Sequence, residues 1–273
     1  MATSLPLITP FGTEPLDDVP LPRAPLAQTL TQIAFPAQSA LVIDGEIASE
    51  LSRRLRPFYP VFQTEQQVNI VITPDGVTQN EGAQVWRLAS KDETWQVHVT
   101  PTFLTLTTTS YTGHEDFCSR LDEAWQGFCE VIGGEPAINR IGFRYINRVD
   151  DRAFLDSLTA MVHPAVTGAL FAGNDVAPIA RGITENQYVV TETDRLQARW
   201  GLLPPGDTFD PFTLPPHSLT SWVLDLDSFR YFGSPQALSD NLAAIVEALS
   251  RTAYRYFRWS VTDEFLKFFG GDA

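Results

Sequence analysis

The chain has 273 residues, of which 44% are hydrophobic and 19% charged, and this composition excludes a chain that is disordered throughout. Its 33 acidic and 19 basic residues give a net charge of −14, which disfavours non-specific binding to nucleic acid or to an anionic membrane. No apolar run approaches the roughly 20 residues that span a bilayer, and the N-terminus lacks the basic start of a signal peptide. We therefore expect a cytoplasmic protein.

The first part of the chain predicts an arm followed by an alternation of strands and helices. Residues 1–27 hold six prolines and no hydrophobic period, which is typical of an extended arm. A short strand is expected at 30–36 and a helix at 45–57. Four further strands follow from alternating apolar residues: 67–73, 83–90, 94–100 and 103–110. A long amphipathic helix at 111–134 should end in a left-handed glycine cap.

The second part repeats this order. A strand at 138–149 precedes a helix at 151–164. Three more strands are expected: 177–190, 195–202 and 221–232. Ser234 and Pro235 should cap and open a second long helix, because serine is a favoured N-cap and proline fits the first helical turn. A short helix at 262–269 closes the chain.

This order predicts an α+β protein with an internal duplication. We expect an arm at 1–27 and two pseudo-repeats, 28–135 and 136–273, each with the order β-α-β(3-4)-α. Because the strands are apolar on one side only, helices should cover one face of a curved antiparallel sheet. The element order resembles the duplicated fold of the TATA-box-binding protein. A likeness of fold implies no function.

An arginine row is the main candidate site. Five arginines are predicted to bind a partner: Arg140, Arg144, Arg148, Arg195 and Arg199. In the strand at 139–149 the apolar side chains mostly fall at odd positions and should face the helices, so the arginines at even positions face the open side. Arginines four residues apart lie about 13 Å apart on an extended strand.

The arginines can also be neutralised within the chain. Four carboxylates lie on or near the neighbouring predicted strands: Glu192, Asp194, Asp225 and Asp227. Cross-strand pairs with them would simply tie the sheet together. In the functional alternative, part of the row meets an acidic or phosphate-bearing partner. The excess of 17 arginines over 2 lysines suits bidentate recognition of carboxylates and phosphates.

Motifs that would indicate catalysis are missing from the sequence. It contains no C-x-x-C pair, no H-x-x-x-H, no G-x-S-x-G and no glycine-rich phosphate loop. His114 and Cys118 are four residues apart on one predicted helix, but a catalytic dyad needs a third, orienting group. The glycines of 168–175 predict a mobile loop, and Cys118 and Cys129 are expected to be reduced thiols. We expect no catalytic residue, no metal and no cofactor.

Four stretches of the chain form a recognisable set: "IAFP", "WQVHVTPTFLTLTTTSYTGHEDF", "RIGFRYINRV" (the RxGxRYINRI motif) and "FRWSVTDEF". Together they resemble a sporadically distributed, uncharacterised family of bacterial and archaeal proteins of similar length. The resemblance covers about residues 25–265, and the long N-terminal arm departs from it. It implies one conserved fold and no established activity. Patchy occurrence is typical of accessory systems such as defence or toxin–antitoxin modules.

Three functions follow as hypotheses. The first is a non-enzymatic interaction protein, such as an antitoxin-like or defence-accessory component, that binds a protein partner through the arginine row. The second is a nucleic-acid-binding protein that uses the same face, against which the net charge argues. The third is an enzyme or small-ligand protein with a cleft between the two halves.

Overall fold

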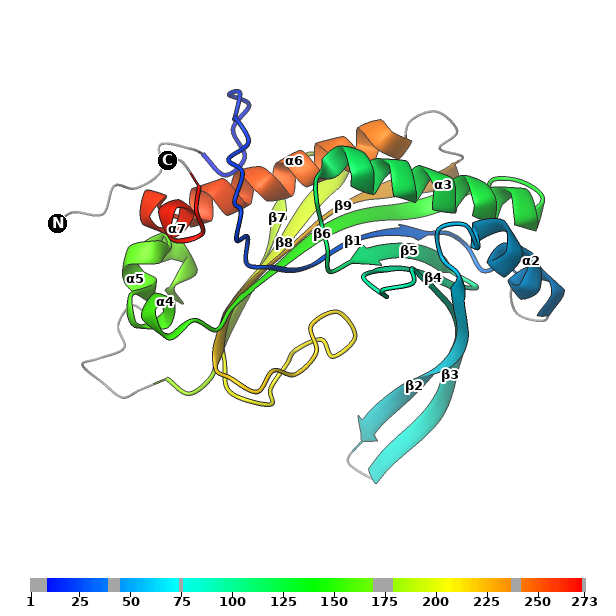
Figure 1. The fold of residues 1–273 in the computed structure, drawn as a ribbon, viewed down its shortest axis with the longest axis horizontal. Helices are drawn as coiled ribbons and strands as arrows, with labels where there is room; N and C mark the ends of the chain where they lie inside the picture. Colours follow the sequence, from blue (N-terminus) through cyan, green and yellow to red (C-terminus); the bar gives the residue numbers. More distant parts are fainter. Residues whose placement is uncertain (1–8, 39–44, 74–75, 169–178, 237–241, 272–273) are drawn as a thin grey trace. The chain divides into compact units, whose positions relative to one another are not determined.

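A computed structural model describes residues 9–38, 45–73, 76–168, 179–236 and 242–271. The described residues form nine strands: β1 (Leu26–Ala34), β2 (Val61–Thr73), β3 (Gly76–Ala89), β4 (Trp95–Thr100), β5 (Phe103–Thr108), β6 (Ile138–Val149), β7 (Gly182–Val189), β8 (Asp194–Leu203) and β9 (Ser221–Gln236). They belong to one open antiparallel sheet with the order β2-β3-β4-β5-β1-β6-β9-β8-β7 (Figure 1). The protein is therefore of the α+β class, as predicted.

Helices join these strands. They are α2 (Gly45–Leu55), α3 (His114–Ile132), α4 (Arg152–Asp156), α5 (Leu158–Met161), the 3-10 turn η1 (Pro164–Val166), α6 (Leu242–Ser260) and α7 (Asp263–Phe268). The chain divides into two compact units. Unit 1 contains residues 1–29, 143–230 and 248–273, and unit 2 contains residues 30–142 and 231–247.

In unit 2 the core lies between α3 and the sheet. Trp125 and Phe128 of α3 pack against Phe35, with ring centroids 6.3 and 5.4 Å apart. Phe117 of the same helix packs against Trp95 of β4 at 5.8 Å. The helix ends as predicted, because Gly133 adopts the left-handed conformation with φ 83° and its N–H bonds back to the last turn.

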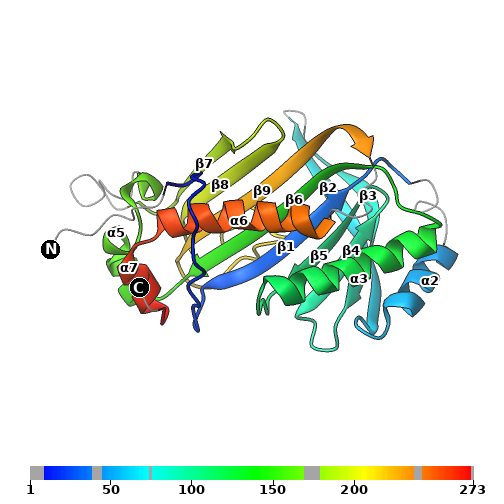
Figure 2. The ribbon, with the colours of Figure 1, turned by 90° about the horizontal axis from the view of Figure 1, so that it is seen from above.

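In unit 1 the core lies between α6 and strands β8 and β9 (Figure 2). Tyr256 and Phe257 of α6 cluster with Trp200 and Trp222, and Trp222 is fully buried. Five tryptophan side chains are only 0–6% exposed: Trp86, Trp95, Trp125, Trp200 and Trp222. Among the described residues, no helix is both long and apolar enough to cross a membrane.

Two predicted elements differ from the structure. The helix expected at 151–164 is broken, because Val162 is fully buried in an extended conformation and forms a bridge with Val261. The helix start expected at Ser234 and Pro235 is wrong, since β9 continues to Gln236 and the residue before a proline favours extended backbone. The glycine loop predicted at 168–175 lies outside the described residues, apart from its first residue.

Candidate interaction site

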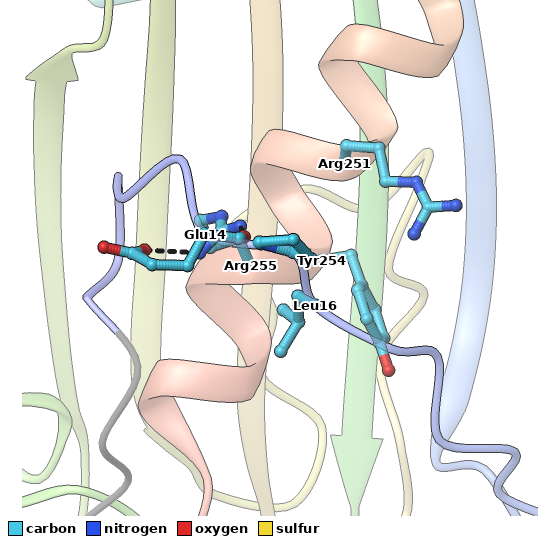
Figure 3. A pocket seen from close by; sticks show the side chains of 6 residues that line it. Glu14, Leu16, Arg251, Tyr254 and Arg255 are labelled. Carbon is cyan, nitrogen blue, oxygen red and sulfur yellow. Dashed lines mark hydrogen bonds and ion pairs between the residues drawn. The ribbon is translucent and has the colours of Figure 1, made fainter.

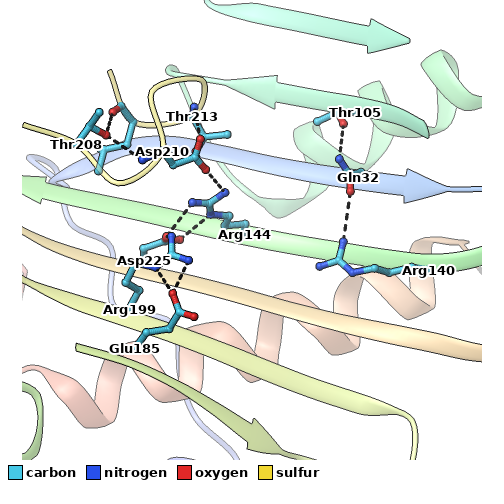
Figure 4. Close-up of polar contacts among 11 residues, drawn as sticks. Gln32, Thr105, Arg140, Arg144, Glu185, Arg199, Thr208, Asp210, Thr213 and Asp225 are labelled. Atoms are coloured by element: carbon cyan, nitrogen blue, oxygen red, sulfur yellow. Dashed lines mark hydrogen bonds and ion pairs between the residues drawn. The ribbon is translucent and has the colours of Figure 1, made fainter. Parts of the chain in front are cut away.

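Arg144 and Arg199 of unit 1 lie on the face of the sheet opposite α6. Residues on a strand alternate between the two faces, and Leu224 and Leu226 of β9 belong to the core under α6. Asp225 therefore points to the other face, and its register partner on β8 is Arg199. Arg144 joins them from β6 (Figure 4).

Arg144 is held in a largely buried ion-pair network. Its Nε donates to Asp225 Oδ1 at 2.7 Å, its Nη2 donates to Asp225 Oδ2 at 2.8 Å, and its Nη1 donates to Asp210 Oδ2 at 3.0 Å. The side chains of Arg144 and Asp225 are 13% and 4% exposed. Burial acts to raise the pKa of Asp210, but hydrogen bonds from Thr213 and Arg144 outweigh it and lower that pKa. The network is therefore charged on both sides and internally satisfied.

Arg199 extends the same network. Its Nε donates to Glu185 Oε2 at 2.6 Å, its Nη1 donates to Asp225 Oδ2 at 3.4 Å, and its guanidinium lies 4.5 Å from the ring centroid of Phe209. Two arginines thus meet three carboxylates, those of Asp225, Asp210 and Glu185. Arg144 and Arg199 are therefore paired with carboxylates of the same chain, and Asp225 is the partner that they share.

The other predicted carboxylates have different roles. Asp194 forms a bidentate pair with Arg230, at 2.6 and 2.7 Å, which lies outside the predicted row. Arg195 donates to backbone carbonyls in the turn before it, including that of Glu192 at 3.2 Å. Asp194 is 8% exposed, and its pKa falls because the bonds from Arg230 outweigh the effect of burial.

Arg148 differs from Arg144 and Arg199 in its partners. Its Nη1 donates to the carbonyl oxygen of Pro215 at 2.7 Å. Its Nε and Nη2 are buried and have no acceptor among the described residues. Burial lowers the pKa of this guanidinium. Two donors of Arg148 are therefore available to an acceptor that the described chain does not supply.

Arg140 lies in unit 2. Its Nη1 donates to Gln32 Oε1 at 3.5 Å, and Gln32 Nε2 donates to Thr105 Oγ1 at 3.5 Å (Figure 4). The strand alternation that placed these arginines on one side of β6 could be read from the sequence. Their individual partners could not, because they come from other strands and loops.

Residues 204–220, here called the cover loop, lie against the arginine-bearing side of unit 1. Leu214 of the loop is 1% exposed and packs into a small apolar cluster with Ile146, Leu203 and Val223. Asp210 of the loop pairs with Arg144, and Pro215 accepts from Arg148. The face is thus covered at these positions by a loop and not left bare. The proline-rich composition gave no signal of this packing.

The most exposed large apolar side chain of the cover loop is that of Phe212, which is 77% exposed. The turn around it is fixed by Asp210, which accepts from the backbone N–H of Thr213 at 3.3 Å and from its hydroxyl at 2.5 Å. Thr208 Oγ1 donates to the carbonyl of Leu214 at 2.5 Å on the other side of the turn. An exposed aromatic ring is therefore held on an ordered support.

The His114–Cys118 contact exists but is unsuited to nucleophilic catalysis. His114 Nε2 lies 3.1 Å from Cys118 Sγ and 2.5 Å from Glu247 Oε2, so one nitrogen serves both neighbours. Burial and the nearby Glu247 raise the pKa of the Cys118 thiol to about 11. A thiol with this pKa stays protonated at neutral pH and is a poor nucleophile.

Neither metal-binding geometry nor sequence similarity identifies a function. In the described part of the chain, no group of three or more His, Cys, Asp or Glu side chains is arranged to hold a metal ion. No protein-family model matches the chain, and no curated protein is significantly similar to it in sequence.

Proposed function

We propose that this protein is a non-enzymatic interaction protein whose arginine-bearing face in unit 1 binds an acidic segment of a protein partner. The observation that carries the proposal is Arg148, whose Nε and Nη2 are buried without an acceptor. An unsatisfied buried donor costs about 1–3 kcal/mol. A carboxylate would take two parallel hydrogen bonds from these donors, which is the favoured geometry of arginine.

The neighbouring residues support a partner that brings both a carboxylate and an apolar pocket. Exposed Phe212 lies in the loop whose Pro215 covers Arg148. Aromatic and arginine side chains are the commonest energetic anchors of protein interfaces. Because Nε and Nη2 of Arg148 are shielded from solvent, binding requires the Pro215 end of the cover loop to shift. Phe212 would then be placed in the partner while Arg148 is paired.

Protein is a better partner than nucleic acid on electrostatic grounds. Three carboxylates surround Arg144 and Arg199, so this network carries no excess of positive charge. The whole chain carries −14. A phosphate backbone carries a dense row of negative charges that both would repel, whereas the proposed protein segment needs to bring only one carboxylate to Arg148. An antitoxin-like or defence-accessory role in the cytoplasm fits a protein whose task is to bind another protein.

We also infer that the chain arose by duplication, as in a fold of the TATA-box-binding-protein type with a curved sheet and helices on one face. Support comes from the sheet order. In each half the first strand lies beside the last strand before the long helix: β1 beside β5, and β6 beside β9. The first strands of the two halves are neighbours. Membership of the RxGxRYINRI family remains a prediction.

The test of function compares two charge reversals. A partner captured from the native host is purified, and its dissociation constant for the protein is measured by calorimetry. Arg148→Glu should weaken binding about tenfold or more, because a charged contact at an interface is lost and a repulsion added. Arg152→Glu is the matched control, since Arg152 is 87% exposed and pairs only with its helix neighbour Asp156 among the described residues.

Equal affinities of the two variants would contradict the proposal. A gel-shift experiment at low salt tests the alternative: a shift of DNA or RNA that Arg148→Glu abolishes would make the face a nucleic-acid site. Arg144 is left intact in this design, because reversing its charge would break the buried pair with Asp225.

A further inference from the structure

The N-terminal arm lies across α6 in unit 1 and meets a row of arginines there (Figure 2). Arg251, Arg255 and Arg258 follow one another at spacings of four and three residues, so they form one stripe along the helix. This stripe is called the α6 arginine stripe. It lies on a different element from the sheet arginines discussed above.

The arm contacts each arginine of the stripe. Asp18 Oδ1 accepts from Arg251 Nη1 at 3.1 Å, and Glu14 Oε2 accepts from Arg255 Nη1 at 3.4 Å. Arg258 Nη1 donates to the backbone carbonyl of Asp17 at 3.1 Å. Two carboxylates and a backbone carbonyl of the arm therefore serve as acceptors for the three arginines.

Apolar anchors hold the arm on both sides of this acidic segment. Phe11 packs against Tyr188 and Tyr256, with ring centroids 5.2 and 5.9 Å apart. Val19 packs into the core of unit 1, and its N–H donates to Tyr254 Oη at 2.8 Å. Between these anchors, the side-chain contacts of residues 14–18 with the stripe are two ion pairs whose carboxylates are 66–68% exposed, so each pair contributes at most about 1 kcal/mol to stability.

The middle of the arm also leaves space over the helix. A pocket of about 390 Å³ lies between Glu14, Pro15 and Leu16 of the arm and the helix (Figure 3). Its helix side is formed by Arg251, Tyr254 and Arg255. Residues 14–16 thus satisfy the charges of the stripe but do not fill the space beside it.

We propose that the α6 arginine stripe is a docking site for an acidic extended segment of a partner protein, and that arm residues 14–18 occupy it in the free chain. The partner segment would carry carboxylates at the positions of Glu14 and Asp18 and a larger apolar side chain at the position of Leu16. Because the arm is tethered, its effective concentration is high. A partner therefore displaces it only with a better fit to the pocket.

The experiment uses the full chain and a synthetic peptide as probe. The peptide spans residues 12–18 with Leu16→Trp, is blocked at both ends and carries a fluorophore, and binding is followed by fluorescence anisotropy. The double variant Glu14→Gln/Asp18→Asn keeps both apolar anchors and loses the two ion pairs of the arm. It should bind the peptide about tenfold more tightly than the unaltered protein, because the competing tethered segment is weakened.

Asp17→Asn is the matched control. It removes one negative charge from the same segment, but Asp17 contacts the helix through its carbonyl oxygen. Its affinity for the peptide should equal that of the unaltered protein. A peptide with Gln and Asn in place of its acidic residues should bind about tenfold more weakly, and a peptide that keeps Leu16 should also bind more weakly than the Trp peptide.

Two results would contradict the proposal. In the first, the double variant binds the acidic peptide no more tightly than Asp17→Asn does; in the second, it binds the neutral peptide as tightly as the acidic one. Either result would mean that the stripe is not a docking site and that the arm is only a structural element. Arg148→Glu should leave peptide binding unchanged, so this result is independent of the proposed function of the sheet face.

Discussion

Arg144 and Asp225 form a bidentate ion pair, in which Nε of Arg144 donates to Oδ1 at 2.7 Å and Nη2 donates to Oδ2 at 2.8 Å. The Asp225 side chain is 4% exposed and also accepts a hydrogen bond from Arg199. The pair ties β6 to β9, and Asp210 ties the cover loop to the same guanidinium. One arginine thereby links two strands and a loop.

Removing the acid of this pair should destabilise the protein strongly. Asp225→Ala leaves Arg144 largely buried with a single carboxylate, and breaking a buried pair costs about 3–5 kcal/mol. The free energy of unfolding is measured by urea denaturation. The control is Asp156→Ala, whose exposed pair with Arg152 should contribute less than about 0.5 kcal/mol. Equal losses in the two variants would show that the buried network contributes no more to the free energy of unfolding than an exposed ion pair does.

Removing the guanidinium of Arg148 should not destabilise the protein. Arg148→Met removes two buried donors that have no acceptor among the described residues. The free energy of unfolding should stay unchanged or rise by about 1 kcal/mol, because an unsatisfied group is replaced by an apolar one. Arg144→Met, the same change at a satisfied position on the same strand, should lower it. A loss of stability in Arg148→Met would mean that this guanidinium stabilises the fold and that its role is not to bind a partner.

His98 should make stability depend on pH. Burial and the charge of Arg87, its register partner on β3, lower the pKa of His98 to about 4. An unfolded histidine has a pKa of about 6.5, so the unfolded state takes up a proton first as the pH falls. The contribution of His98 is therefore fully present above pH 6.5 and is lost between about pH 6.5 and pH 4.

The measurement compares the unaltered protein with His98→Gln. Between pH 7.5 and pH 5, the difference in free energy of unfolding should shift by about 2 kcal/mol in favour of the variant. Carboxylates that titrate in this range are common to both proteins and cancel. Parallel curves would show that His98 is protonated as readily in the folded state as in the unfolded one.

Gly201 should tolerate no side chain. Its φ is 147°, and a Cβ atom at this position would lie 1.8 Å from the carbonyl oxygen of Gly182 on β7. Gly201→Ala must separate β7 from β8, with an expected loss of about 3 kcal/mol or more. Gly206→Ala is the control: its φ is also positive, at 78°, but no heavy atom lies within 4 Å. That variant should lose only about 1 kcal/mol, from the backbone conformation. Thermal unfolding of both variants checks the difference.

Local signals in the sequence predicted much of the fold. The strand expected at 138–149 is β6, and the glycine cap expected after the first long helix is formed by Gly133. Both depend on neighbours in the sequence. The short helix expected at 262–269 begins as the sequence suggests, since the Thr262 hydroxyl accepts from the N–H of Phe265.

The site was less predictable because its contacts are distant in the sequence. Asp210 and Arg144 are 66 residues apart, and Arg144 and Asp225 are 81 residues apart. Side-chain alternation placed the arginines on one face, but it could not tell which of them would find a carboxylate. The broken helix at 151–164 has the same origin, since the pairing of Val162 with Val261 overrides the helical pattern.

The two units are interwoven along the chain, and this has a consequence for biosynthesis. Unit 1 is completed only by residues 248–273, which are synthesised after all its other residues. Until then Trp200 and Trp222 lack the helix that buries them. The nascent chain therefore exposes an aggregation-prone apolar surface that chaperones can recognise. A premature stop codon after β9 would leave that surface permanently uncovered and direct the product to proteolysis.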